Sequence, residues 1–90
     1  MELRHIRYFK AVAEEKNFTR AAEKLAIAQP PLSRQIQDLE AELGTELFVR
    51  SPHKVTLTEE GELFLQYASQ ILDLVNKSEE EVREMREGLT

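Results

Sequence analysis

The chain has 90 residues, a formal net charge of −5 and no cysteine. A chain of this length forms one domain at most and buries only about 60–65% of its unfolded surface, so oligomerisation is the expected source of further stability. The lack of cysteine excludes disulfides, thiolate metal sites and cysteine nucleophiles. The lack of a signal peptide or a long apolar run predicts a cytoplasmic protein without a membrane anchor.

Two short helices are predicted before residue 26. In the first, apolar side chains recur at helical spacing at Leu3, Ile6, Phe9, Val12 and Ala13. In the second, they recur at Phe18, Ala21, Ala22 and Leu25. Asn17 directly precedes the second helix and is predicted to be its N-cap, because its side-chain oxygen can accept from an unpaired N–H group of the first turn.

A third helix is predicted after a tight break. Its buried stripe consists of Leu32, Ile36, Leu39 and Leu43. Two prolines stand in its first turn, where their missing N–H groups would have no intrahelical partner anyway. Two short amphipathic helices around a tight break form a helix-turn-helix, which predicts a three-helix core and duplex DNA as the partner.

The exposed face of the third helix is narrow and polar. Helices that read DNA usually do so with their N-terminal residues. Arg34 is expected to donate to guanine O6 and N7, Gln29 to pair with adenine, and the proline rings to pack against a thymine methyl. The predicted base-contacting residues are Gln29, Pro30, Pro31, Ser33, Arg34 and Gln37.

A short two-stranded wing is predicted after Gly44, which ends the third helix. Residues 47–50 and 54–57 favour strands and flank a turn at residues 51–53. Such wings lie along the DNA backbone or minor groove, although a loop tip that contacts nothing is the alternative. The predicted backbone or wing contacts are Asn17, Thr19, Arg20, Arg50, His53 and Lys54.

The net charge divides unevenly along the chain. Residues 1–54 hold nine Lys and Arg against eight Asp and Glu, a net of +1, while residues 55–90 hold three against nine, a net of −6. DNA affinity depends on the local basic patch, because that patch releases the counterions. The basic residues are expected to gather at the DNA-facing elements, with Glu14, Glu15, Glu40, Glu42 and Glu46 elsewhere; a merely solvated surface is the alternative.

A long helix is predicted from residue 59 to residue 87, with Thr58 as its cap. It would be roughly 43 Å long, too long to pack on one small domain. Apolar residues at alternating spacings of four and three form a coiled-coil seam, which predicts an antiparallel or crossed homodimer. The predicted dimer contacts are Phe64, Ala68, Ile71, Val75, Val82 and Met85, with Ser78 and Leu89 on the same seam. A second set, Leu63, Tyr67, Leu72 and Leu74, widens the apolar surface, so the near end is expected to pack on its own core as well.

Three sequence blocks resemble the N-terminal domain of the LysR-type transcriptional regulators. The family pattern A-A-x-x-L matches residues 21–25, Q-P-x-x-S-x-x-I-x-x-L-E matches residues 29–40, and L-G-x-x-L-F-x-R matches residues 43–50. The chain departs from many members at Ala28, where they have serine, and from many helix-turn-helix turns at Ala26, where they have glycine.

The resemblance implies a winged helix-turn-helix DNA-binding domain, residues 1–57, followed by a linker or dimerisation helix, residues 58–90. It implies transcription regulation by a homodimer on an imperfect inverted repeat with T at one end and A at the other. In family members an effector-binding domain with the architecture of a periplasmic binding protein follows and carries inducer sensing and much of the tetramer contact. This chain is therefore expected to bind no small-molecule ligand and no cofactor.

Other functional classes have less support in the sequence. His5 and His53 have no partner at metal-like spacing and the three glycines form no phosphate loop, so neither an enzyme nor a metal site is expected. A protein-interaction module that uses the winged fold as a scaffold remains an alternative. A related metal-oxyanion-responsive regulator is another, since it would share this domain and differ only in the missing C-terminal part.

Overall fold

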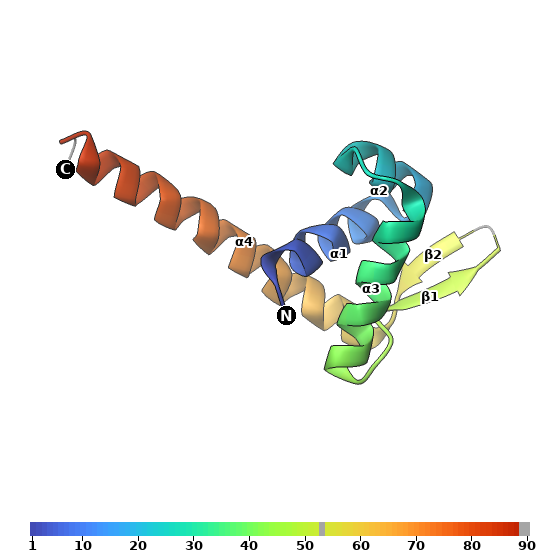
Figure 1. Cartoon of the computed structure of the whole chain (residues 1–90). Coiled ribbons are helices and arrows are strands. Elements are labelled where there is room, and N and C mark those ends of the chain that lie inside the picture. Colours follow the sequence, from blue (N-terminus) through green and yellow to red (C-terminus); the bar gives the residue numbers. More distant parts are fainter. Residues whose placement is uncertain (53, 89–90) are drawn as a thin grey trace.

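Four helices and one β-hairpin make up residues 1–52 and 54–88, the part of the chain that the computed structural model describes. In chain order they are α1 (Leu3–Glu15), α2 (Phe18–Leu25), α3 (Gln29–Leu43), β1 (Phe48–Ser51), β2 (Lys54–Leu57) and α4 (Glu59–Arg86). Helices α1 to α3 form a cluster, the hairpin projects from one side of it, and α4 runs away from the other side (Figure 1). The predicted fold, a winged helix-turn-helix followed by a long helix, is confirmed.

Local backbone chemistry ends the first three helices. Lys16, Ala26 and Gly44 each follow a helix in the left-handed conformation, with φ of 55°, 58° and 73°, and this conformation lets the backbone bond the last helical carbonyls. Asn17 caps α2, because its Oδ1 accepts a hydrogen bond from the Arg20 N–H at 2.9 Å. The conformation of Ala26 is costly, since a left-handed residue other than glycine costs about 1–2 kcal/mol.

One apolar core joins the helices and the hairpin. Phe9 of α1 is fully buried, and its ring centroid lies 5.3 Å from that of Phe48 in β1 and 5.0 Å from that of Phe64 in α4. The largest fully buried side chains are Phe9, Val12, Leu32, Ile36, Leu39 and Leu47. Because three of these belong to one side of α3, the opposite side of α3 is left to solvent.

Hydrogen bonds join the first turn of α4 to the segment that precedes the hairpin. The Thr58 hydroxyl donates to the Glu46 carbonyl at 2.8 Å and accepts from the Gly61 N–H at 3.0 Å. The Thr58 N–H donates to the Leu47 carbonyl at 3.0 Å. Gly61 lies so close to this segment that a Cβ atom would be 2.1 Å from the Leu47 carbonyl oxygen. Thr58 is thus the predicted cap, and only glycine fits at position 61.

The wing differs from the predicted one by one residue. Strand β1 begins at Phe48, and Ser51 belongs to the strand instead of the turn, since it pairs with Lys54 across the hairpin. Leu47 lies before the strand and is only 1% exposed. Its N–H donates to the Glu40 carboxylate at 2.7 Å, so a side chain of α3 fixes the base of the hairpin.

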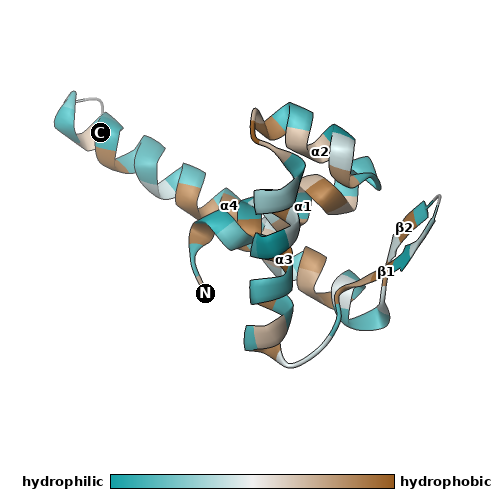
Figure 2. Ribbon diagram, turned by 45° about the vertical axis from the view of Figure 1, so that its right-hand side comes forward, coloured by the Kyte–Doolittle hydropathy of each residue, from teal (hydrophilic) through white to brown (hydrophobic). Residues whose placement is uncertain are grey.

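The long helix α4 has two parts with different surroundings. Its first part packs on the core through the fully buried Ala68 and the partly buried Ile71 and Leu72, whereas Val82 and Met85 are 66% and 71% exposed. The molecule is 53 Å long and 19 Å across its shortest dimension, and apolar residues continue along the projecting helix (Figure 2). None of the helices within the described ranges combines the length and the apolar character that a membrane crossing requires.

Candidate nucleic-acid interface

The six predicted base-contacting residues share the solvent-facing side of α3. Pro30, Pro31, Arg34 and Gln37 are exposed, and Gln29 and Ser33 are half-buried. Pro30, Arg34 and Gln37 lie on one face because residues three and four apart share a face of a helix, and the other three residues flank them. The structure therefore brings all six together, and their contact with DNA bases stays a prediction.

Helix α3 begins without a side-chain cap. Ala28 stands at the N-cap with extended backbone, φ −74° and ψ 153°, and its methyl group accepts no hydrogen bond. Pro30 and Pro31 follow in the first turn. The positive end of the helix dipole thus lies beside the exposed Arg34, which favours an anionic partner at this end of the helix.

The start of α2 supplies a second group of polar side chains. Thr19 and Arg20 are exposed in its first turn. Asn17 is exposed as well, but its Oδ1 is occupied by the Arg20 N–H, so only its amide nitrogen remains as a donor for another partner. These three residues stay predicted backbone contacts.

Arg50 connects the hairpin to α2 and α3. Its guanidinium carbon lies 4.7 Å from the centroid of the Phe18 ring at the start of α2. Its Nη2 lies 3.6 Å from Oε1 of Glu40 on α3. Because stacking on an aromatic ring and pairing with a carboxylate both constrain a guanidinium, Arg50 has a defined direction in the free protein.

The position of Glu40 corrects the expectation that this carboxylate lies away from the DNA-facing elements. Its side chain is 14% exposed, beneath the hairpin. Its Oε2 accepts from the N–H groups of Leu47 at 2.7 Å and Phe48 at 3.3 Å. The chain reverses after α3 and carries these two amides back to the last turns of that helix. The short separation in sequence between Glu40, the last residue of the second block, and the L-F-x-R motif was the available signal for this contact.

An open cleft of 380 Å³ lies between α3 and β1. Its lining consists of Gln37, Glu40, Glu46, Phe48, Val49 and Arg50. It places a predicted base contact, Gln37, and a predicted backbone contact, Arg50, on the walls of one groove. Lys54 is exposed at the start of β2, and His53, the remaining predicted wing contact, lies outside the described residues.

Three cations of this surface have no carboxylate partner within 4.0 Å in the described part of the chain. The ion pairs found there join the amino terminus to Glu42, Arg4 to Glu2, Lys24 to Glu15 and Arg50 to Glu40. Arg20, Arg34 and Lys54 take part in none of them. Their charges are therefore available to neutralise phosphates and release counterions.

The structure contradicts one residue of the predicted dimer seam, Ala68 at the start of α4, and the other seam contacts stay predictions. Ala68 is fully buried in the core of its own protomer, and Phe64 and Ile71 pack partly against the same core. Ala68 therefore has no surface left for a partner. The physical reason is that α4 must cover α1 with the face that the alternating spacing of four and three assigns to a second chain.

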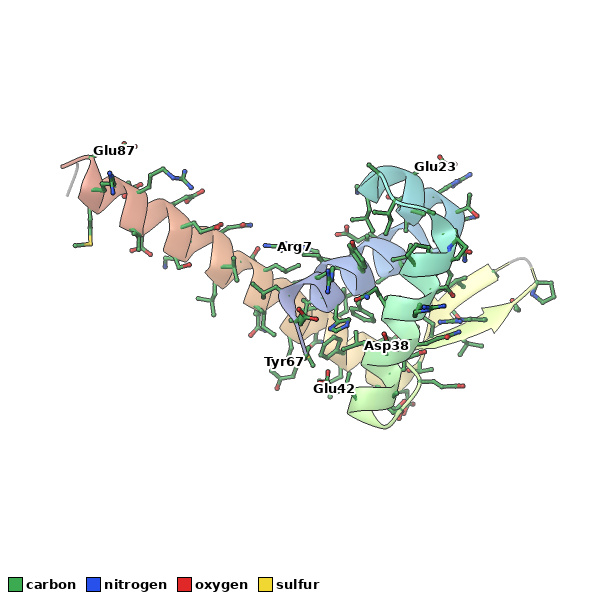
Figure 3. The ribbon with its side chains drawn as sticks, viewed as in Figure 1. Arg7, Glu23, Asp38, Glu42, Tyr67 and Glu87 are labelled. Atoms are coloured by element: carbon green, nitrogen blue, oxygen red, sulfur yellow. The ribbon has the colours of Figure 1, made fainter. Side chains whose placement is uncertain are left out.

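A different face of α4 is free. Leu63, Tyr67 and Leu74, from the second apolar set, are 56%, 55% and 65% exposed, and they share one side of the helix with Met85. Figure 3 labels Tyr67 on the first part of α4 and Glu87 beyond its far end. Leu89, the last residue of the predicted seam, lies outside the described residues.

His5 lies in the first turn of α1. His5 accepts a hydrogen bond at Nδ1 from the Glu2 N–H at 3.0 Å, beside the start of α1. Within residues 1–52 and 54–88, no three His, Cys, Asp or Glu side chains are grouped so that they could hold a metal ion.

Known sequences are similar to most of this chain. The sequence model of bacterial regulatory helix-turn-helix proteins of the lysR family matches residues 3–62. The transcriptional regulator BenM of Acinetobacter baylyi is 60% identical over 77 residues, which cover 86% of this chain. The chain spans 25% of the length of BenM, so the likeness concerns one part of that protein.

Two solved structures resemble the chain over nearly its whole length. The BenM DNA-binding domain in complex with benA site 1 DNA has a TM-score of 0.94 and 53% identity, and covers 98% of this chain and 99% of that chain. The complex of the CbnR DNA-binding domain with DNA has a TM-score of 0.92 and 44% identity, with coverage of 96% and 99%. The fold described above, including α4, is thus similar to that of two DNA-bound domains.

Proposed function

Since the chain belongs to the lysR family of bacterial regulatory helix-turn-helix proteins, we propose that it reads duplex DNA for a transcription regulator. It binds as a homodimer to an imperfect inverted repeat, with α3 in the major groove. One observation carries this proposal. Four of the six candidate base-contacting residues, Pro30, Pro31, Arg34 and Gln37, are exposed on α3 and the other two are half-buried, in a fold that overlays on a DNA-bound domain with a TM-score of 0.94.

Arg34 is the principal base reader of this proposal. It is exposed near the start of α3 and takes part in no ion pair of the described residues. A guanidinium can donate two parallel hydrogen bonds to guanine O6 and N7, which contributes about 1–3 kcal/mol of discrimination. The amides of Gln29 and Gln37 suit adenine, the Ser33 hydroxyl suits either a donor or an acceptor, and the proline rings suit a thymine methyl.

Phosphate contacts are proposed on both sides of α3. They come from Asn17, Thr19 and Arg20 at the start of α2 and from Arg50, His53 and Lys54 of the hairpin. Such contacts fix the orientation of a protein on the duplex but carry no sequence information themselves. They explain why a chain with a net charge of −5 can bind DNA, because only the local cations meet the phosphates.

The homodimer uses the exposed apolar face of α4. In an antiparallel pair with its two-fold axis at Leu74, Leu63 lies opposite the partner's Met85, since both are equally far from the axis. The stretch from residue 63 to residue 85 is about 33 Å long. A hollow of about 190 Å³, lined by Leu43, Leu63 and Tyr67 among others, lies at the Leu63 end of this face. It can receive the side chain of the partner's Met85. The two-fold axis relates two copies of α3, which then select an inverted repeat.

The remaining functions of the regulator are assigned to other residues than these 90. Residues 1–57 supply the DNA-contacting surface and residues 58–90 supply the dimer surface, although the first part of α4 shares the domain core. Inducer sensing and tetramer contacts are assigned to the effector-binding domain of the regulator. DNA as the partner places the protein in the bacterial cytoplasm, on the nucleoid.

Selection of bound duplexes from a random DNA pool, repeated at two salt concentrations, tests the proposal. Enrichment of an inverted repeat is the expected result. Recovery of no preferred sequence, together with binding that disappears at moderate salt, would contradict it, because only unspecific phosphate attraction behaves in that way. The interaction-module alternative, which the comparisons do not favour, would then take its place.

A further inference from the structure

One carboxylate of α3 ties the base of the wing to this helix. Glu40 Oε2 accepts from the N–H groups of Leu47 at 2.7 Å and Phe48 at 3.3 Å. These two residues lie immediately before and at the start of β1. The angle between the hairpin and α3 therefore depends on the carboxylate of Glu40.

The second oxygen of the same carboxylate holds Arg50. Glu40 Oε1 lies 3.6 Å from Arg50 Nη2, and the two side chains are 14% and 36% exposed. On its other side the guanidinium stacks on the Phe18 ring at 4.7 Å, and that ring packs edge-on against Phe48 at 6.0 Å. A guanidinium has five N–H donors, and Glu40 approaches only one of its nitrogens. The others remain available at the wall of the open cleft that also contains Gln37.

We propose that Glu40 is a positioning residue for DNA binding, which fixes the wing against α3 and directs the Arg50 guanidinium toward a DNA phosphate. The inference rests on the proposed function. An arginine that is free in solution loses much of its rotamer freedom when it becomes fixed. Arg50 has lost most of this freedom before DNA arrives.

The first test compares Glu40→Gln with Glu46→Gln on the inverted repeat that the selection recovers. Both variants remove one negative charge from the same cleft, but the Glu46 side chain makes no hydrogen bond to the wing among the described residues. Glu40→Gln keeps an acceptor for the wing amides and loses the charge that holds Arg50. We expect about fivefold weaker binding for Glu40→Gln and a salt slope reduced by about 1, the effect of one lost phosphate contact. Glu46→Gln should bind as the wild type does or more tightly.

A double-mutant cycle separates positioning from general support of the fold. In an Arg50→Ala background, Glu40→Gln should change the affinity less than twofold, because the residue on which it acts is gone. A carboxylate that only supported the fold would weaken binding by the same factor in both backgrounds, and that result would overturn the inference. Arg50→Lys keeps the charge but loses the fork and the stacking, and it should weaken binding by a similar factor to Glu40→Gln.

The outcomes distinguish this inference from the proposed function. If the wild type selects no inverted repeat, the proposed function fails and the inference fails with it. If the wild type selects one and Glu40→Gln binds it as tightly as Glu46→Gln, only the inference fails. Should Glu40→Gln not fold by circular dichroism, Arg50→Lys decides alone, since wild-type affinity and salt slope in that variant would equally overturn the role of a positioned guanidinium.

Discussion

The two halves of α4 form one continuous helix, but different surroundings stabilise them. In the first half Ala68 is fully buried and Gly61 lies against the backbone of Leu47, whereas in the second half Val82 and Met85 are 66% and 71% exposed. The alternating spacing of apolar residues is the same in both halves. A seam in the sequence therefore indicates that a helix face will be covered, but it does not indicate which molecule covers it.

Substitution of Gly61 by alanine should disrupt the packing of the first half of α4. The new Cβ atom would lie 2.1 Å from the Leu47 carbonyl oxygen, which belongs to the backbone and cannot rotate away. We expect the free energy of unfolding to fall by about 3 kcal/mol, the upper end for overpacking, in urea titrations followed by circular dichroism. Gly44→Ala is the control, because nothing lies within 4 Å of its Cβ position and only its left-handed φ of 73° is strained. Equal losses in the two variants would contradict the close packing at Gly61.

Substitution of Leu74 by aspartate should disrupt the dimer contact made by the second half of α4 and leave the core of the protomer intact. A charge on the two-fold axis would face its own copy, so light scattering should show a monomer. Binding to the full inverted repeat should weaken about a hundredfold, which corresponds to about 2.7 kcal/mol, with binding to a half-site unchanged. Asn76→Asp adds the same charge on the opposite side of α4 and should have neither effect. A dimer of undiminished stability in Leu74→Asp would show that the dimer uses another face.

Substitution of Arg34 by alanine should change DNA recognition without a change in either half of α4. We expect a loss of about 2 kcal/mol on the preferred duplex, with relaxed preference at one base pair, in fluorescence anisotropy titrations against duplexes that vary at that position. Dimerisation and the unfolding midpoint should stay as in the wild type. Lys77→Ala removes the same charge from α4 and is the matched control. A loss that is uniform over all duplexes would instead identify Arg34 as a phosphate contact.

The smallest expected effect is a gain in stability that concerns only the helix-turn-helix. Ala26 has a left-handed φ of 58°, and glycine takes this conformation without strain. Ala26→Gly should raise the free energy of unfolding by about 1 kcal/mol, or the midpoint by about 4–8 °C. Ala41→Gly, at an exposed position in the last turn of α3, should lower the free energy of unfolding by up to about 1 kcal/mol. Destabilisation by both substitutions would show that the turn gains nothing from glycine.

The sequence predicted the order and type of all elements, because each depends on local chemistry. Apolar spacing defined the buried faces of α1, α2 and α3, Asn17 and Thr58 were identified as caps, and Gly44 as the end of α3. The exposed face of α3 followed from the same spacing, since side chains that are not buried must point to the other side. The predicted limits of β1 were wrong by one residue, because the N–H of Leu47 bonds the Glu40 side chain of α3 and not the opposite strand.

Only the tertiary structure determined which residues from separate elements meet. Glu40 was expected away from the DNA-facing surface, yet the chain reversal after α3 brings two backbone amides and Arg50 to its carboxylate. Ala68 was expected in a dimer seam, yet it is buried in the core of its own protomer. The physical reason is the same in both cases. Periodicity along one segment defines which side chains must be covered, whereas the identity of the covering group depends on how distant segments fold together.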